Sequence, residues 1–167
     1  LTLPAYMLHQ VEEHAGDRFR RFANKRVLRV PDALSTPMVI AINIPVVWGA
    51  LLLSIYLARF VGIGWGLIAA YALLVNAAVH VVAAIAMRCA NPGLFTALFI
   101  FVPLGLWALL AISPLPGVTL LQQVVGIAFA ARLRESGNPR GLIAGEDVGN
   151  GRVGEHRLGR AKPAIDG

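Results

Sequence analysis

The stretch Val61–Met87, VGIGWGLIAAYALLVNAAVHVVAAIAM, decides the fold of this protein. It is longer than the roughly 20 apolar residues that a helix needs to cross the hydrocarbon core of a bilayer. It carries no Lys, Arg, Asp or Glu, and its one imidazole is His80. A helix that is apolar on every side needs lipid or a large protein core around it. The stretch therefore predicts a transmembrane helix.

Apolar runs of similar kind lie on both sides of this stretch. Pro37–Ala58 and Gly93–Ile112 are long enough to span, and Gly117–Ala131 is shorter. The N-terminal part, Leu1–His14, reads as the end of a first membrane helix, with a re-entrant or interfacial helix as the alternative. The chain starts with Leu rather than Met, and we expect that first helix to begin upstream. The pattern predicts an all-α, polytopic transmembrane bundle of four to five helices.

Composition and charge support the same class. Hydrophobic residues make up 57% of the 167 residues and charged ones 14%, and the mean hydropathy is +0.67. Between Ala33 and Ala131 the only formal charges are Arg59 and Arg88. The net charge of +6 could indicate nucleic acid, but the basic residues flank apolar runs, where they set topology and attract anionic lipids. We therefore expect membrane lipids as partners and exclude nucleic acid.

The basic clusters divide the chain into regions. We predict a transmembrane domain over residues 1–132, with a basic interfacial helix at 17–30, and a flexible basic tail over 133–167. The positive-inside rule then puts the loop 17–32 and the tail in the cytoplasm, in a membrane of the bacterial inner type. Pro45 and Pro103 lie inside predicted spans, where they predict kinks.

Ionisable residues gather at the end of the first predicted helix. At 100° per residue, Glu12 lies about 60° to one side of His9 and Glu13 about 40° to the other, so the three share a face. His14 lies about 140° away and is expected to point elsewhere. Ionisable side chains inside a membrane are costly and mark functional sites.

Depth along the helices indicates that residues of other spans reach the same level. His80 lies roughly 12 Å in from Arg88, at the cytoplasmic end of its helix, and Asn76 shares its face one turn away. Asn43 lies about 9 Å into the preceding span. We therefore expect helix packing to bring these side chains to the histidine and glutamates of the first helix.

The gathered residue types are those that hold Zn²⁺ or non-haem Fe²⁺. The predicted metal ligands are His9, Glu12, Glu13 and His80. Of these, the glutamates and His80 are also the predicted catalytic groups, with Asn43 and Asn76 as hydrogen-bonding partners that orient the imidazoles. The alternative is structural: Glu12 and Glu13 pair with Arg18 or Arg20, and His80 bonds only to Asn76.

The string His9–Glu13, HQVEE, resembles the signature of the HXXEE family of membrane proteins. The resemblance extends to Asn76-x3-His80, to Asn91-Pro92-Gly93-Leu94 and to Thr96-Ala97, and covers roughly His9 to Leu106. It implies that the motif residues matter. It implies no particular substrate, because the family has no assigned reaction.

Several functions fit this pattern. The leading one is a metal-dependent membrane enzyme, of hydrolase or oxygenase type, acting on a lipid or another hydrophobic small molecule that enters between helices. A metal-free lipid isomerase or cyclase could use the carboxylates as acid and base. A small proton- or cation-coupled transporter and a non-catalytic scaffold are the alternatives from other classes. The pattern indicates no oligomeric state.

Overall fold

The computed structural model describes residues 1–136, and within them the secondary structure is helical, with turns and loops between the helices and no strand. Five helical rods make the bundle, and a short basic helical segment joins the first rod to the second. The predicted all-α transmembrane bundle is confirmed. Most of the predicted tail lies outside the described residues. The last rod, α8 (Leu120–Ser136), continues past the predicted boundary at residue 132.

Three rods are long and apolar enough to cross a membrane, and they match the three long predicted runs. They are Thr36–Phe60, Ile63–Met87 and Leu94–Ile112, with mean hydropathies of 2.2, 2.1 and 2.4 over their best windows. The first rod combines α3 (Thr36–Ala41), a π-helical stretch (Ile42–Trp48) and α4 (Gly49–Phe60). The second rod is a 3-10 turn (Ile63–Gly66) followed by α5 (Leu67–Met87). The third rod combines α6 (Leu94–Thr96), a π-helical stretch (Ala97–Phe101) and α7 (Val102–Ile112). The apolar part of α8, Leu120–Leu133, is shorter.

Both prolines inside the spans are associated with π-helical turns. Pro45 lies within Ile42–Trp48, and Pro103 follows directly on Ala97–Phe101. Proline has no N–H to donate and its ring crowds the preceding turn, so a locally wider helix relieves both problems. The second of these wide turns follows Thr96, a residue of the site described below.

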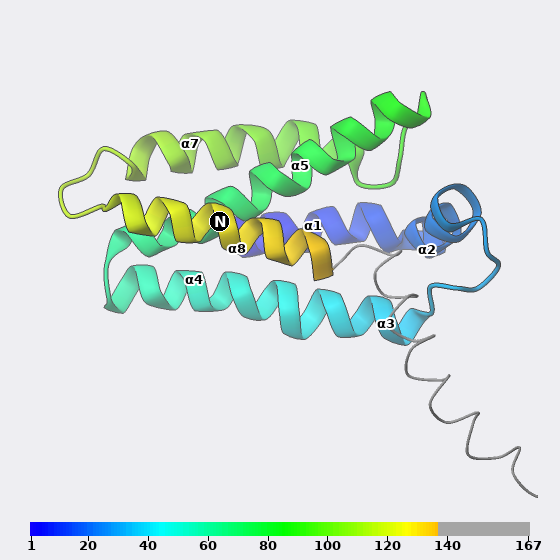
Figure 1. Cartoon of the computed structure of the whole chain (residues 1–167), viewed down its shortest axis with the longest axis horizontal. Coiled ribbons are helices and arrows are strands. Elements are labelled where there is room, and N and C mark those ends of the chain that lie inside the picture. The colour runs from blue at the N-terminus through cyan, green and yellow to red at the C-terminus, as the bar shows by residue number, and fades with distance from the viewer. Residues whose placement is uncertain (137–167) are drawn as a thin grey trace, which may run out of the picture.

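The helix α5 is the central element of the bundle. It contacts α1 (Thr2–His14), α4, α7 and α8, and Figure 1 shows it crossing obliquely between α7 and the α3–α4 rod. Its buried side includes Leu67 and Leu73, which are fully covered, as is Phe101 on the neighbouring rod. Small residues such as Ala70 and Ala77 let the neighbouring helices approach closely. Side chains on α5 therefore face the interior shared by the other rods.

The short basic segment forms one end of the bundle. It consists of α2 (Arg18–Phe22) and the π-helical stretch Ala23–Leu28, and it begins after a turn in which Gly16 and Asp17 both have a left-handed backbone. The Arg20 guanidinium binds the Asp17 carboxylate and holds its pKa below the usual range. This segment, the start of α3 and the end of α5 lie at the same end of the molecule (Figure 1). The predicted interfacial helix is therefore present as a helical segment.

The outside of the bundle is apolar. Large aliphatic side chains on several rods are left uncovered, among them Leu110 (73% exposed), Ile85 (72%) and Leu120 (78%). Soluble monomers do not leave apolar surface of this extent open to water, whereas lipid covers it without cost. The surface and the three spanning rods together describe a membrane protein.

A candidate metal centre beside an apolar cavity

Two histidines and one glutamate meet where α1 packs on α5. His9 and Glu13 are separated by four residues on α1, and both are buried. His80 comes from the middle of α5 and is also buried. The Glu13 carboxylate lies between the two imidazoles, with Oε2 3.8 Å from His9 Nε2 and Oε1 3.6 Å from His80 Nε2. Among the described residues these three form a group that could hold a metal ion, with ligand atoms all within 4.8 Å of one another.

Asn91 sets the orientation of His80. The Asn91 side-chain N–H₂ donates to the backbone carbonyl of His80 (2.8 Å), which leaves its Oδ1 as an acceptor facing His80 Nδ1 at 2.6 Å. His80 therefore donates from Nδ1, and its Nε2 carries the free lone pair. That lone pair points to Glu13. A hydrogen bond at one imidazole nitrogen commonly fixes the other as the metal ligand.

His9 is oriented in the same way, through Thr96. The Thr96 hydroxyl lies 2.6 Å from Glu12 Oε2 and donates to it, so it accepts from His9 Nδ1 at 2.7 Å. The Thr96 hydroxyl also lies 3.3 Å from the Gly93 carbonyl, but the shorter contact to a carboxylate is the stronger one. Both imidazoles thus present an unprotonated Nε2 toward Glu13.

Glu12 does not face the two Nε2 atoms. Its carboxylate accepts from the backbone N–H groups of Phe95 (3.2 Å) and Thr96 (2.7 Å) as well as from the Thr96 hydroxyl. The sequence predicts Glu12 as a ligand together with Glu13, whereas the structure groups only Glu13 with the histidines. Glu12 instead accepts from backbone N–H groups at the start of the helix that carries Thr96. It acts on His9 through the Thr96 hydroxyl. Within residues 1–136 neither glutamate pairs with Arg18 or Arg20. Arg18 instead donates to the Ala15 carbonyl, and Arg20 pairs with the carboxylates of Asp17 and Asp32.

Gly93 closes one side of the site. Its φ of +90° is a conformation that residues with a side chain rarely adopt. A Cβ at this position would lie 2.6 Å from His9 Cε1 and 2.8 Å from His80 Cε1, closer than packed atoms allow. The absence of a side chain at residue 93 therefore lets both imidazoles lie against the loop backbone.

The two asparagines predicted to orient the imidazoles bind elsewhere. Asn76 donates to the Tyr6 hydroxyl (2.9 Å), and Asn43 bridges Gln10 and His14 at 2.8 and 3.2 Å. The residues that orient the imidazoles are Asn91 and Thr96, in place of the predicted Asn43 and Asn76. His14 also differs from expectation, since its Nε2 reaches to within 3.5 Å of Glu13 Oε2.

The donor set fits a metal ion. Among the described residues, His9 Nε2 is fully buried and has no hydrogen-bond partner, which is costly for a lone pair unless something binds it. Ligand atoms at about 2.0 Å from a tetrahedral metal lie about 3.3 Å from each other, whereas the ligand atoms here lie 3.6 Å, 3.8 Å and up to 4.8 Å apart, so a bound ion would draw them together. Two histidines with one carboxylate is a ligand set of catalytic zinc sites and of non-haem iron sites.

A cavity of about 310 Å³ adjoins the centre. Glu13 and His80 line it, so the side of the centre that they form is open to a molecule inside it. Most of the remaining wall is apolar and comes from α2, α3, α5 and α8. Asn76 also lines the cavity, and its Oδ1 is buried without a partner within the described residues. The cavity thus offers an apolar space with two of the three candidate metal ligands and the Asn76 side chain on its wall.

The fold and site define a polytopic membrane protein with a buried group of two histidines and one glutamate. A protein family described as "Protein of unknown function with HXXEE motif" matches residues 1–108, which include His9, Glu12, Glu13 and His80. The chain belongs to this family. Comparison with curated proteins and with solved structures gives no match.

Proposed function

We propose that this protein is a metal-dependent membrane enzyme, of the hydrolase type, that acts on a hydrophobic substrate. The observation that carries the proposal is the buried group His9, Glu13 and His80, whose Nε2 lone pairs and carboxylate face each other beside an apolar cavity. Catalytic zinc sites combine three such ligands with one open coordination position. A bound zinc ion would supply a Lewis acid and lower the pKa of a coordinated water.

The residues of the chain have separate roles in this proposal. His9, Glu13 and His80 bind the metal, with Asn91 and the Glu12–Thr96 pair holding the imidazoles in the required tautomer. The apolar cavity excludes bulk water and aligns the substrate next to the centre. Asn76 Oδ1 accepts a hydrogen bond from a polar group of the substrate. Iron in the same ligand set would instead support oxygenase chemistry, so the identity of the metal decides between the two reactions.

Loop charge gives the proposed orientation in the membrane. Glu13 and His80 line the same cavity as Phe19, Phe22 and Val27 of the basic segment, and short basic loops stay on the cytoplasmic side. The substrate would then come from the cytoplasmic leaflet of a bacterial-type inner membrane.

The metal content of detergent-purified protein tests the proposal. We expect near-stoichiometric zinc or iron in the wild type and in Cys89→Ser, which removes the one cysteine of the chain. Glu13→Gln and the His9→Ala/His80→Ala double variant should lose it. Lipid extracts incubated with the loaded protein should then contain species that have gained the elements of water. Metal-free protein that still converts lipid would overturn the proposal and assign the chemistry to Glu13 and His80 directly.

A further inference from the structure

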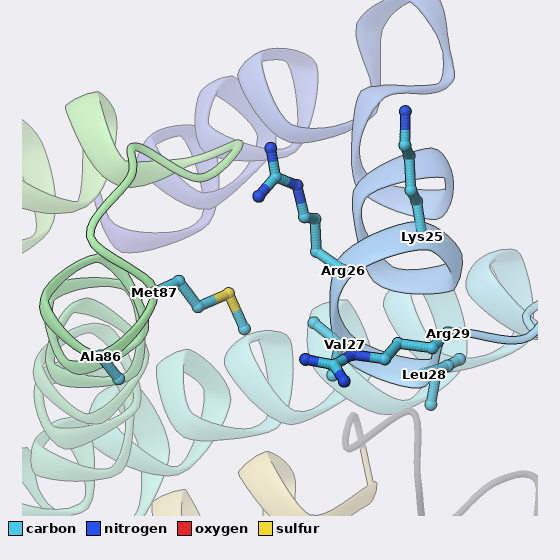
Figure 2. A pocket seen from close by; sticks show the side chains of 7 residues that line it. All are labelled: Lys25, Arg26, Val27, Leu28, Arg29, Ala86 and Met87. Carbon is cyan, nitrogen blue, oxygen red and sulfur yellow. The ribbon is translucent and has the colours of Figure 1, made fainter.

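A second, open hollow lies next to the apolar cavity and has basic walls. It encloses about 800 Å³ between the π-helical stretch Ala23–Leu28, with Arg29 after it, and the end of α5. Its lining residues are Lys25, Arg26, Val27, Leu28, Arg29, Ala86 and Met87. Figure 2 shows the guanidinium groups of Arg26 and Arg29 on the side of the basic segment that faces Met87, while Lys25 extends away from it.

Within the described part of the chain, the basic side chains of this hollow have no acidic partner. Arg18, Arg20 and Arg21 bind backbone carbonyls or aspartates of their own segment. In residues 1–136, by contrast, the side chains of Arg26 and Arg29 form no ion pair and no hydrogen bond, and both are exposed. Two unpaired guanidinium groups on one wall favour an anionic ligand, because guanidinium binds phosphate oxygens with paired hydrogen bonds.

The basic hollow and the apolar cavity adjoin each other. Val27 and Met87 line both of them. From Met87 the apolar cavity follows one face of α5 through Ala83 to His80. Seven residues of helix separate Met87 from His80, a rise of about 10 Å. A molecule with a charged head and an apolar chain could therefore bind with its head at the arginines and its chain along α5 to the metal centre.

We propose that the substrate is a net-anionic, phosphate-bearing lipid whose head is held by Arg26 and Arg29. The inference rests on the proposed function for the reaction itself, but the binding site stands on its own observations. The hollow begins at Met87, about 10 Å along α5 from His80, so the bond that is hydrolysed would be the ester or amide that joins the apolar chain to the head, and not a bond to phosphorus. Water would add across that bond, the chain would leave as a carboxylic acid, and the phosphate would remain on the head fragment.

Binding of three probes to the full-length protein in an uncharged detergent tests the site. The probes are a single-chain phosphatidic acid, the phosphatidylcholine with the same chain, and inorganic phosphate. We expect the anionic lipid to bind at least about tenfold more tightly than the other two. Equal binding of both lipids would overturn the inference, and so would phosphate that binds as tightly as the anionic lipid, since it would indicate a soluble anion as the ligand.

Variants separate a specific head site from general attraction of charge. Arg26→Gln with Arg29→Gln should weaken the anionic lipid about thirtyfold, at about fivefold per arginine, and leave the phosphatidylcholine unchanged. Arg18→Gln removes one positive charge from the same segment but outside the hollow, and should leave the binding of the anionic lipid unchanged, whereas each arginine of the hollow should account for about a fivefold loss. Ala83→Phe should block the chain and weaken both lipids. An equal loss in Arg18→Gln, or none in the double variant, would refute a head site.

Metal content measured on the same samples keeps the two proposals apart. Selective lipid binding by metal-free protein would retain the head site and reject the proposed enzyme. Metal-loaded protein without selectivity for the anionic lipid would retain the proposed metal centre and reject the head site. In turnover, product masses should show the chain released as a carboxylic acid and the phosphate retained on the head fragment, and a product that has lost its phosphate would contradict the 10 Å spacing, which is about seven residues of helix.

Discussion

At the scale of single residues, the backbone of Gly93 decides whether both histidines fit. We expect Gly93→Ala to lower metal affinity at least about tenfold, because the added methyl would push on both imidazoles at their Cε1 atoms. Gly117→Ala is the matched control, since Gly117 also has a positive φ (+84°) but has nothing within 4 Å of its Cβ position. Titration with Zn²⁺ in competition with a chelator measures both variants. Equal losses would mean that backbone strain alone is responsible.

The two glutamates of the motif are expected to respond differently. Glu13→Gln should abolish near-stoichiometric metal binding, because it replaces one carboxylate oxygen by N–H₂, and the two oxygens of Glu13 face His9 and His80 respectively. Glu12→Gln should retain the metal with reduced affinity, since Glu12 accepts from Phe95 and Thr96 and reaches His9 through the Thr96 hydroxyl. Metal content after dialysis separates the two outcomes. If Glu12→Gln alone loses the metal, the assignment of Glu13 as the ligand is wrong.

Thr96 provides a separate test of how His9 is held. Thr96→Val keeps the shape of the side chain but removes the hydroxyl that accepts from His9 Nδ1. We expect a loss of about ten- to a hundredfold in metal affinity, the usual cost of removing a partner of a ligating histidine. The Thr119 hydroxyl forms hydrogen bonds with Gln122 at the start of α8, away from the site. Thr119→Val should therefore bind metal as the wild type does. Unchanged affinity in Thr96→Val would show that packing alone orients the ring.

The sequence could predict that His9, Glu13 and His80 come together, because ionisable residues are rare in and beside apolar membrane runs, and that they bind a metal stays a prediction. It could not choose between Glu12 and Glu13, since both lie within about 60° of His9 on the helix. The choice depends on Thr96, which belongs to another rod and takes up Glu12. Asn76 and Asn91 show the same limit. Asn76 is one turn from His80 along the helix, but Asn91 is brought back by the turn after α5 and reaches both the ring and the carbonyl of His80.

At the scale of elements, one side chain fixes the basic segment to the loop before α3. Asn24 is buried, and its amide donates to the Leu34 carbonyl (3.2 Å) and accepts from the Leu34 N–H (2.8 Å). We expect Asn24→Ala to leave both backbone groups unpaired, at a cost of about 1–3 kcal/mol for each group that stays buried. Faster amide hydrogen exchange at residues 23–34 would report this loss of stability. Lys25→Ala, a change at the neighbouring exposed residue, should leave exchange slow, and equally slow exchange in Asn24→Ala would contradict the role of this amide.

The spanning rods could be predicted from the sequence almost to the residue, because apolar length is set by bilayer thickness rather than by packing detail. The predicted run Gly93–Ile112 compares with an observed rod of Leu94–Ile112. The π-helical turns could not be placed in this way. They depend on how each proline is accommodated by its neighbours, which hydropathy does not describe.

At the scale of the whole molecule, the metal centre would tie α1 to the rest of the bundle. His9 and Glu13 lie on α1 and His80 on α5, so an ion bound by all three joins two rods that are far apart in sequence. A ligand that binds only the folded state stabilises it, by about 2.7 kcal/mol at a free concentration of 100 times its Kd. Zn²⁺ should therefore raise the thermal midpoint of unfolding, followed by tryptophan fluorescence in detergent. Mg²⁺, which prefers oxygen ligands, should not.

The variants make this shift specific to the centre. Cys89→Ser should show the wild-type increase, whereas His80→Ala should show none, and the metal-free midpoint of His80→Ala reports whether the variant is folded. An equal increase in His80→Ala would mean that Zn²⁺ binds elsewhere. His80→Ala could keep the wild-type midpoint without metal and lose only the response to Zn²⁺. The contact between α1 and α5 would then not depend on the His80 imidazole, and the role of that imidazole at the contact would be to bind the ion. That outcome would explain why three ionisable groups lie buried at a helix contact where apolar side chains would pack at lower cost.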